Sequence, residues 1–143
     1  MKIRPMTMED YDQVLILMRG EPGVSVRAAD SPEAITRYLD RNPGFSFVAE
    51  SEERVVGCVF AGHDGRRGSL HHLVVAPAYR RTGVGRLLVT QSLDSLQAAG
   101  IEKTLIDVFS DNDSAPAFWC KLGWEERIDL RRLSFNRSKD PNV

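Results

Sequence analysis

Apolar side chains recur every three or four positions in several stretches of the chain, which is the spacing of one face of an α-helix. We expect helices over residues 8–19, 32–41, 84–99 and 115–122. Start and stop signals agree with these bounds. A threonine precedes the first stretch, a serine–proline pair opens the second, and glycines follow the first, third and fourth.

Other stretches are short and rich in β-branched or aromatic residues. They predict strands over residues 2–4, 45–50, 55–61, 70–75, 104–109 and 130–135. A polar turn separates the second from the third, so we expect this pair to form a hairpin. Strands outnumber helices, and hairpins interrupt their alternation. These features exclude a plain doubly wound parallel sheet and predict an α/β fold with a mixed sheet.

Length and composition are those of an ordinary globular protein. The 143 residues suit one compact domain, expected over residues 1–137, with a polar tail over residues 138–143. The formal charge of −1 gives no field that would recruit nucleic acid or an anionic membrane, so an anion needs a local site. No apolar run is long enough to span a bilayer and no signal peptide is present, so we expect a cytoplasmic protein. Cys58 and Cys120 are predicted to be buried thiols, and no metal is expected.

The clearest candidate chemistry lies at the start of the predicted third helix, in the segment Arg80-Arg81-Thr82-Gly83-Val84-Gly85-Arg86. Free backbone N–H groups and a partial positive charge gather at a helix start, which makes it a site for anions. Gly83 and Gly85 have no side chain to keep a phosphate away from the backbone, and the arginines add charged donors. The segment predicts a phosphate or pyrophosphate site.

Two common phosphate-binding motifs do not fit this segment. A dinucleotide fingerprint requires a third glycine three residues after the second, and Leu88 occupies that position. A Walker loop ends in Gly-Lys-Ser/Thr, whereas Gly85 is followed by Arg86 and Leu87. Both nucleotide-binding motifs are therefore excluded.

Three neighbouring patterns together resemble the GNAT superfamily of N-acetyltransferases. The spacing Arg80-x-x-Gly83-x-Gly85 is similar to its Q/R-x-x-G-x-G/A motif, and Leu73-Val74-Val75-x-Pro77 resembles its fourth strand. Asn112, followed by Phe118-Trp119-x-x-Leu122-Gly123-Trp124, resembles its second motif. The resemblance covers nearly the whole chain. Residues 62–68 further resemble the YpeA-like branch, which is close to the ribosomal-protein-alanine N-acetyltransferases.

The resemblance implies a GNAT-type fold, in which a largely antiparallel sheet opens between its splayed fourth and fifth strands. It implies acetyl-CoA as the cosubstrate, with the pantetheine arm along the fourth strand and the pyrophosphate on the helix start. The implied cofactor contacts are Leu73, Val74, Val75, Arg80, Arg81, Thr82, Gly83, Val84, Gly85, Arg86, Asn112 and Trp119. An amine would attack the thioester directly. The acceptor, whether a small amine, an amino acid derivative or a protein N-terminus, stays open, and so does a homodimer.

The same resemblance implies three catalytic residues. The amide of Val75 would polarise the thioester carbonyl. An acceptor ammonium must lose a proton, and Asp107 stands where the ribosomal-protein enzyme has a catalytic glutamate. His71 stands where serotonin N-acetyltransferase has a histidine. Structural roles for Asp107 and His71 are the alternatives. Strand alternation predicts that His71 and His72 lie on opposite faces, so at most one would meet the acceptor.

Trp119 departs from the family pattern, because many members carry a tyrosine there that protonates the departing thiolate. An indole N–H cannot act as a general acid, so Trp119 would pack on the pantetheine or in the helix core. In the loop over residues 21–30, Glu21 and Asp30 would suit a cationic amine, whereas Arg27 would suit a carboxylate. A non-catalytic acyl-CoA-binding module and a phosphate-binding interaction domain remain as alternatives to an enzyme.

Overall fold

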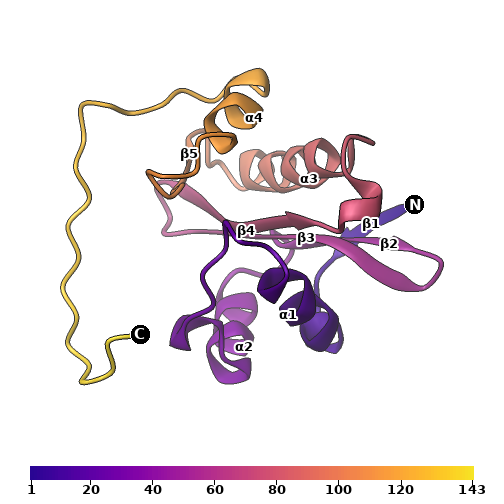
Figure 1. Ribbon diagram of the computed structural model, residues 1–143, viewed down its shortest axis with the longest axis horizontal. Coiled ribbons are helices and arrows are strands. Elements are labelled where there is room, and N and C mark those ends of the chain that lie inside the picture. Colours follow the sequence, from indigo (N-terminus) through magenta and orange to yellow (C-terminus); the bar gives the residue numbers. More distant parts are fainter.

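The computed structural model describes residues 1–143 and is built around one five-stranded sheet, whose strands lie in sequence order (Figure 1). The first four strands run antiparallel to their neighbours, and the last runs parallel to the fourth. This confirms the mixed sheet predicted from the hairpins. The strands are β1 (Lys2–Pro5), β2 (Phe47–Ser51), β3 (Arg54–His63), β4 (Gly68–Val75) and β5 (Thr104–Ile106).

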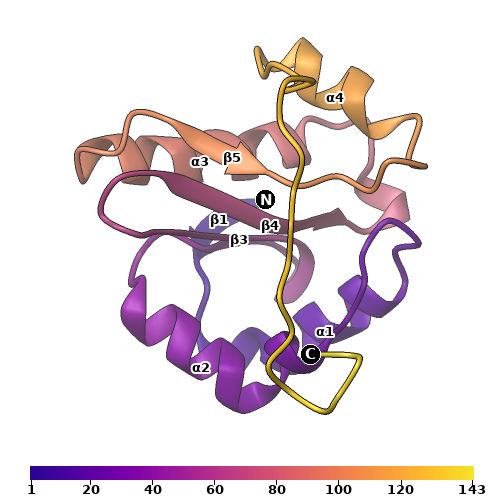
Figure 2. The ribbon, with the colours of Figure 1, turned by 90° about the vertical axis from the view of Figure 1, so that its left-hand side faces the viewer.

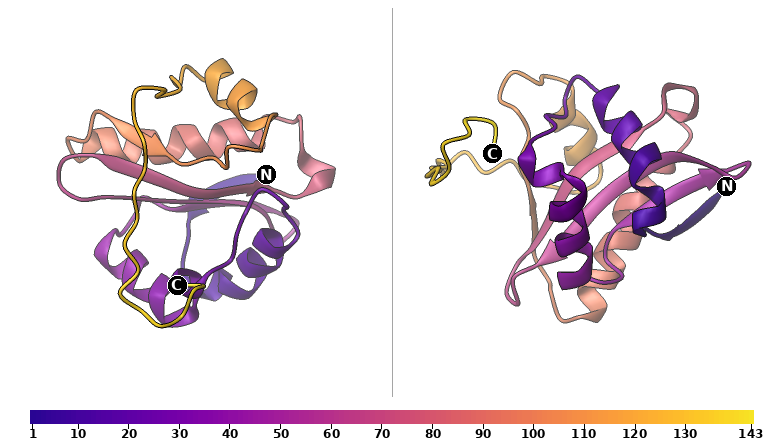
Figure 3. Two further views of the ribbon diagram at one scale, coloured as in Figure 1. Left: turned by 60° about the vertical axis from the view of Figure 1, so that its left-hand side comes forward. Right: turned by 90° about the horizontal axis from the view of Figure 1, so that it is seen from below.

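Helices cover both faces of this sheet (Figure 1). On one face lie α1 (Tyr11–Arg19) and α2 (Pro32–Arg41), which Figure 3 shows from below. On the other lie α3 (Val84–Ala98) and α4 (Ala115–Lys121). The predicted helices are thus all present. Short 3₁₀ helices, η1 (Met8–Asp10), η2 (Ala28–Asp30) and η3 (Pro77–Tyr79), occupy three of the connections.

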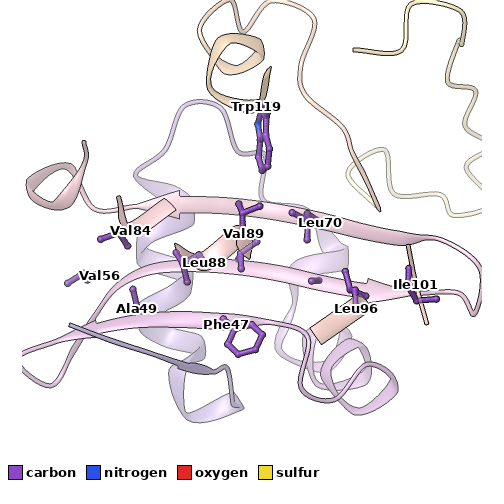
Figure 4. Close-up of a cluster of buried hydrophobic side chains, with 12 residues drawn as sticks. Phe47, Ala49, Val56, Leu70, Val84, Leu88, Val89, Leu96, Ile101 and Trp119 are labelled. Atoms are coloured by element: carbon purple, nitrogen blue, oxygen red, sulfur yellow. The ribbon is translucent and has the colours of Figure 1, made fainter. Parts of the chain in front are cut away.

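Because helices pack on both faces of the sheet, the protein has two apolar cores. One lies between the sheet and α3, with Trp119 reaching it from α4 (Figure 4). The other lies between the sheet and α1 and α2, and it includes Val14, Met18 and Ile35. Strand β3 runs through the centre and is buried from residue 55 to residue 62, because both of its faces are covered. Its near-continuous apolar sequence follows from that position.

The C-terminal part of the chain differs from the prediction. The strand expected over residues 130–135 is wrong: no strand follows α4, and Leu133 and Phe135 are 92% and 86% exposed. The apolar alternation changes phase within this stretch, because Ile128 and Leu130 fall on one side of an extended chain and Leu133 and Phe135 on the other. Neither face is continuously apolar, so neither specifies a strand register.

The residues after α4 instead run as an extended tail past the edge of the sheet toward η2 (Figure 2). There the amide of Ala28 donates to the carbonyl of Asn142 at 3.1 Å. Strand β5 also ends three residues earlier than predicted, at Ile106. Of the two cysteines expected to be buried, Cys58 is buried and Cys120 is exposed, because Cys120 lies on the outer side of α4.

Candidate active site

Strands β4 and β5 pair over only three residues each. Their register joins Gly68 to Thr104 and Leu70 to Ile106, and no pairing continues beyond Leu70. Residues 71–75 therefore have a strand neighbour on the β3 side alone. This is the predicted opening between the fourth and fifth strands, and it leaves one edge of β4 free for an extended ligand.

The hydrogen-bond pattern shows which way Val75 faces. The amide of Ala76 donates to the carbonyl of Val56 at 2.8 Å, so this pair is a hydrogen-bonded one. Residues alternate between hydrogen-bonded and non-hydrogen-bonded pairs along an antiparallel ladder, and Val75, opposite Gly57, is of the second kind. Its amide and carbonyl are directed away from β3, toward the free edge. The Val75 carbonyl accepts a hydrogen bond there from Nε of Arg80 at 3.1 Å.

The predicted anion site lies directly after this strand, at the start of α3. Gly83 precedes the helix with φ +89°, a left-handed conformation that glycine adopts without strain. A side chain added at Gly83 would meet no atom within 4 Å, so the backbone there is open to a ligand. None of the amides of residues 81–86 donates a hydrogen bond within the chain. These amides and the dipole of a 15-residue helix form an anion cradle, a name we use for residues 81–86.

Two charged residues hold the loop that adjoins the cradle. The guanidinium of Arg80 forms a salt bridge with Glu21 at 2.9 Å, in addition to its bond to β4. Arg80 therefore ties the loop after α1 to the end of β4. Asn112 lies on the other side of the same loop, because its Nδ2 would be 3.0 Å from a side chain added at Gly23. Its Oδ1 accepts from the amide of Ala115 at 3.2 Å and so caps α4.

Trp119 lies in the core beneath α4. It is 7% exposed, and its ring packs edge-on against Trp124 and Phe118 at centroid distances of 4.9 and 5.2 Å. Figure 4 shows the indole pointing from α4 toward the sheet. Phe118, in contrast, would lie 3.4 Å from a side chain added at Gly85, so it borders the start of α3. A contact of Trp119 with CoA stays a prediction.

A cavity of about 480 Å³ lies beside β4 on the face that α2 covers. It is formed by the loop before η2, by η2 and α2, and by residues of β3 and β4. We call it the acceptor cavity. Its lining residues are Ser25, Arg27, Ala29, Asp30, Ala34, Ile35, Arg37, Tyr38, Arg41, Phe60, His71 and His72.

Both histidines of β4 line this cavity, so the prediction that they lie on opposite faces is wrong. The register of β4 against β3 shifts between the pairs Cys58–Val74 and Phe60–His71, and His72 has φ +50°. Such a bulge places an extra residue in one strand and redirects its side chains. The rings of His71 and His72 consequently lie 6.4 Å apart, centroid to centroid. A bulge at a non-glycine residue has no reliable signature in the sequence.

His72 is held by a buried carboxylate. Its Nε2 lies 2.8 Å from Oδ1 of Asp30, and the amide of Arg27 donates to Oδ2 of Asp30 at 2.9 Å. Burial would raise the pKa of Asp30, but these two hydrogen bonds outweigh it and lower the pKa below its ordinary value. Asp30 is therefore ionised at neutral pH with both oxygens engaged.

His71 is free of such a partner. Its side chain is exposed to solvent at the cavity, and the rings of Tyr38 and His72 lie beside it at centroid distances of 6.0 and 6.4 Å. Desolvation of the ring, followed by the nearby charge of His72, lowers the pKa of His71 below 6.5. The ring is thus neutral at pH 7 and able to accept a proton.

Asp107, the other candidate base, follows β5 on the far side of the opening. Its carboxylate forms a salt bridge with Arg132 of the tail at 2.8 Å, and the side chains of Asp107 and Arg132 are 61% and 73% exposed. The two candidates differ in their surroundings. His71 lines the cavity, whereas Asp107 is paired with Arg132 and lies near enough for its charge to act on the pKa of His71.

Several lining residues were not predicted as site residues from the sequence, and Tyr38, Arg37 and Arg41 are the polar ones among them on α2. Tyr38 has the one buried side-chain polar atom without a hydrogen-bond partner, and burial raises its pKa to about 12. Its ring packs edge-on against His71 at 6.0 Å. Arg37 and Arg41 are four residues apart on α2, and this spacing is the one feature of the sequence that predicts that both lie on the same face of the helix.

Comparison with known proteins identifies the family. The chain matches the family described as Acetyltransferase (GNAT) family over residues 11–124. An acetyltransferase of Yersinia pestis (strain Pestoides F) is 36% identical over 126 residues, which are 87% of this chain and 88% of that protein. The chain therefore belongs to the GNAT family of acetyltransferases, as its motifs predicted. Its assignment to the YpeA-like branch stays a prediction.

Solved structures show the same fold. An aminoglycoside 6'-N-acetyltransferase from Acinetobacter haemolyticus has a TM-score of 0.75 at 21% identity, with 98% of this chain and 100% of that chain covered. The PaiA N-acetyltransferase from Thermoplasma acidophilum, solved in complex with coenzyme A, has a TM-score of 0.73 at 17% identity, with 85% and 87% covered. At these identities the likeness concerns the fold alone. No helix of the protein has the length and apolar character that crossing a membrane requires.

Proposed function

We propose that the protein is an N-acetyltransferase that moves the acetyl group of acetyl-CoA to a primary amine by direct attack in a ternary complex. One observation carries the proposal. The free edge of β4, residues 71–75, leads at one end into the anion cradle and at the other into the acceptor cavity. A donor site and an acceptor site thus meet along a single strand.

The residues of the cradle and of β4 fit acetyl-CoA. Six amides without internal acceptors and the open backbone at Gly83 suit a pyrophosphate. Arg81 and Arg86 border the same turn and can add charge-assisted bonds. The outward-facing amide of Val75 suits the thioester oxygen at the end of a pantetheine arm that lies extended along the free edge of β4. Bound acetyl-CoA would supply an activated thioester carbonyl beside Val75.

His71 is the base that the geometry favours for the acceptor amine. It is neutral at pH 7, lines the cavity, and belongs to the same free stretch of β4 as Val75. It would hold the acceptor amine by a hydrogen bond and take its proton. Val75 would donate its amide hydrogen to the thioester oxygen. Asp107 is kept as a second candidate base, reachable only when Arg132 releases it.

A second function is favoured by Trp119. A buried indole stands where the family usually has a titratable tyrosine, so this chain has no acid at that position. The same cradle could then serve a non-catalytic acyl-CoA-binding module. The enzyme remains the better proposal, because such a module has no need for a neutral histidine beside the free edge of β4.

Release of free CoA thiol separates the two functions. The full-length protein is incubated with acetyl-CoA and a panel of primary amines at pH 7.5, and the thiol is followed over time. We expect acceptor-dependent, saturable release. Saturable binding of acetyl-CoA without release by any amine would support the binding module and contradict the enzyme.

A further inference from the structure

The charges around the acceptor cavity point to the class of acceptor. The cavity is lined by three arginines, Arg27, Arg37 and Arg41, and by one carboxylate, that of Asp30. From the sequence alone, the acidic and basic residues of this region favoured opposite substrates. The contacts remove that ambiguity, because they show which charges are already engaged.

The acidic residues have no free charge to offer a cationic substrate. Both oxygens of Asp30 are engaged, one by His72 at 2.8 Å and the other by the amide of Arg27 at 2.9 Å. Glu21, in the same loop, is paired with Arg80 at 2.9 Å and does not line the cavity. A polycationic amine would therefore find no unpaired carboxylate here.

The arginines, in contrast, are not neutralised. Arg37 and Arg41 form no salt bridge and donate no side-chain hydrogen bond within the chain. Arg27 donates to Oδ1 of Asn142 at 3.0 Å, an uncharged amide oxygen of the tail. A planar guanidinium binds carboxylate and phosphate oxygens in preference to such an amide. Three arginines without a carboxylate partner around one cavity create a positive local field, although the whole chain carries a charge of −1.

We propose that the acceptor is an amine that also carries an anionic group, bound by Arg27, Arg37 and Arg41, while its amino group lies at His71. The apolar side chains of Phe60, Ile35 and Ala34 line the same cavity. The inference rests on the proposed transferase activity and narrows its substrate. It excludes aminoglycosides and polyamines, which would bring several positive charges to the arginines.

The test assays matched pairs of acceptors with the full chain and measures the release of free CoA thiol from acetyl-CoA for each. Amino acids and dipeptides are paired with their carboxamides, and phosphoethanolamine is paired with ethanolamine. Spermidine and kanamycin form the polycation arm. We expect kcat/KM to be about tenfold or more higher for the anionic member of a pair, from loss of charge-assisted bonds in the neutral member. The carboxylate and phosphate pairs show which anion the site takes.

The arginines are tested with the variant Arg37→Gln/Arg41→Gln, with Arg54→Gln as the control, because Arg54 is exposed at the start of β3 and outside the cavity. We expect KM for the anionic acceptor to be about tenfold higher in the double variant, with kcat unchanged. For the neutral acceptor of the same pair, both KM and kcat should match those of the wild type. The control should match the wild type. An equal effect on both members of a pair would contradict recognition by these residues.

The remaining outcomes separate this inference from the proposed function. Preferred turnover of neutral amines or polycations would overturn the anionic acceptor and leave the transferase standing. Absence of release in every arm, with acetyl-CoA still bound, would overturn the transferase and with it the inference.

Discussion

The proposed donor site and the proposed acceptor site of this protein consist of different chemical groups. The anion cradle, residues 81–86, uses backbone amides at a helix start, and glycine conformations keep those amides accessible. The acceptor cavity uses side chains from β3, β4, η2 and α2, brought together by the fold. A site made of backbone amides can be predicted from the spacing of glycines in the sequence. A site made of side chains from distant segments has almost no such sequence pattern. The difference explains why the sequence predicts a donor site more readily than an acceptor site.

The largest expected effect comes from breaking the donor side at Gly83. We expect Gly83→Val to weaken acetyl-CoA binding by about 100-fold or more, because the side chain displaces charge-assisted amide bonds and strains a left-handed residue. Isothermal titration calorimetry measures the affinity. Gly65→Val is the matched control, since Gly65 also has a positive φ, +92°, with no atom within 4 Å of an added side chain.

Both glycine variants should lose similar stability, and only Gly83→Val should lose affinity. Equal affinity in the two variants would remove the cradle as the pyrophosphate site.

The next largest effect lies on the acceptor side, at His71. We expect His71→Gln to lower kcat by about 100-fold, the usual contribution of a general base. The low pKa of His71 means that its neutral, active form is lost as the pH falls through a value below 6.5. The wild-type kcat/KM should therefore fall on the acid side of that value, and the variant should lack this limb.

Two other variants serve as a control and as a test of the second candidate base. His63→Gln, at the end of β3 and outside the cavity, should behave as the wild type. Asp107→Asn distinguishes the second candidate base. If the acid limb persists in His71→Gln and disappears in Asp107→Asn, the roles proposed for these two residues are reversed.

A smaller effect is expected from the support beneath the cavity, at Asp30. We expect Asp30→Asn to lower the free energy of unfolding by about 1–3 kcal/mol, since the buried bonds to His72 and to the Arg27 amide are weakened. The pKa of Asp30 is lowered in the folded state, so its contribution is present at neutral pH and is lost as the pH falls below 3.8.

Urea unfolding at pH 7 and pH 3 checks this expectation, with Asp40→Asn as an exposed control on α2. The difference between wild type and Asp30→Asn should shrink at the lower pH. A difference that stays constant would show that charge on Asp30 does not contribute.

The smallest effect is expected from the tail. Asn142→Ala removes one hydrogen bond to an exposed arginine, and we expect the free energy of unfolding to change by less than about 0.5 kcal/mol. Thermal unfolding measures it. A loss well above 1 kcal/mol would mean that the tail is part of the packed structure.

The sequence predicted most of the fold, because the apolar periods of the helices and of β2 to β4 match faces that are buried. The prediction failed over residues 130–135, where the alternation of apolar residues changes phase and no strand forms. The predicted helix start at Val84 is confirmed, and the glycines beside it made an anion site predictable from the sequence; its binding of a pyrophosphate stays a prediction.

The acceptor side could not be predicted to the same depth. The bulge at His72 turns both histidines to one cavity, and it depends on the pairing of β4 with β3. The engagement of Asp30 by His72 joins residues that are 42 positions apart. Whether Arg27, Arg37 and Arg41 are free or paired is decided by contacts between distant segments, which neither spacing nor composition encodes.

Amide hydrogen exchange with and without acetyl-CoA tests the central claim most directly, because it reports on the backbone groups assigned to the donor. At saturating acetyl-CoA we predict slower exchange in residues 73–75 and 81–86, with the turn over residues 64–67 unchanged. Unchanged exchange in residues 81–86, at a concentration where calorimetry shows acetyl-CoA to be bound, would contradict the account.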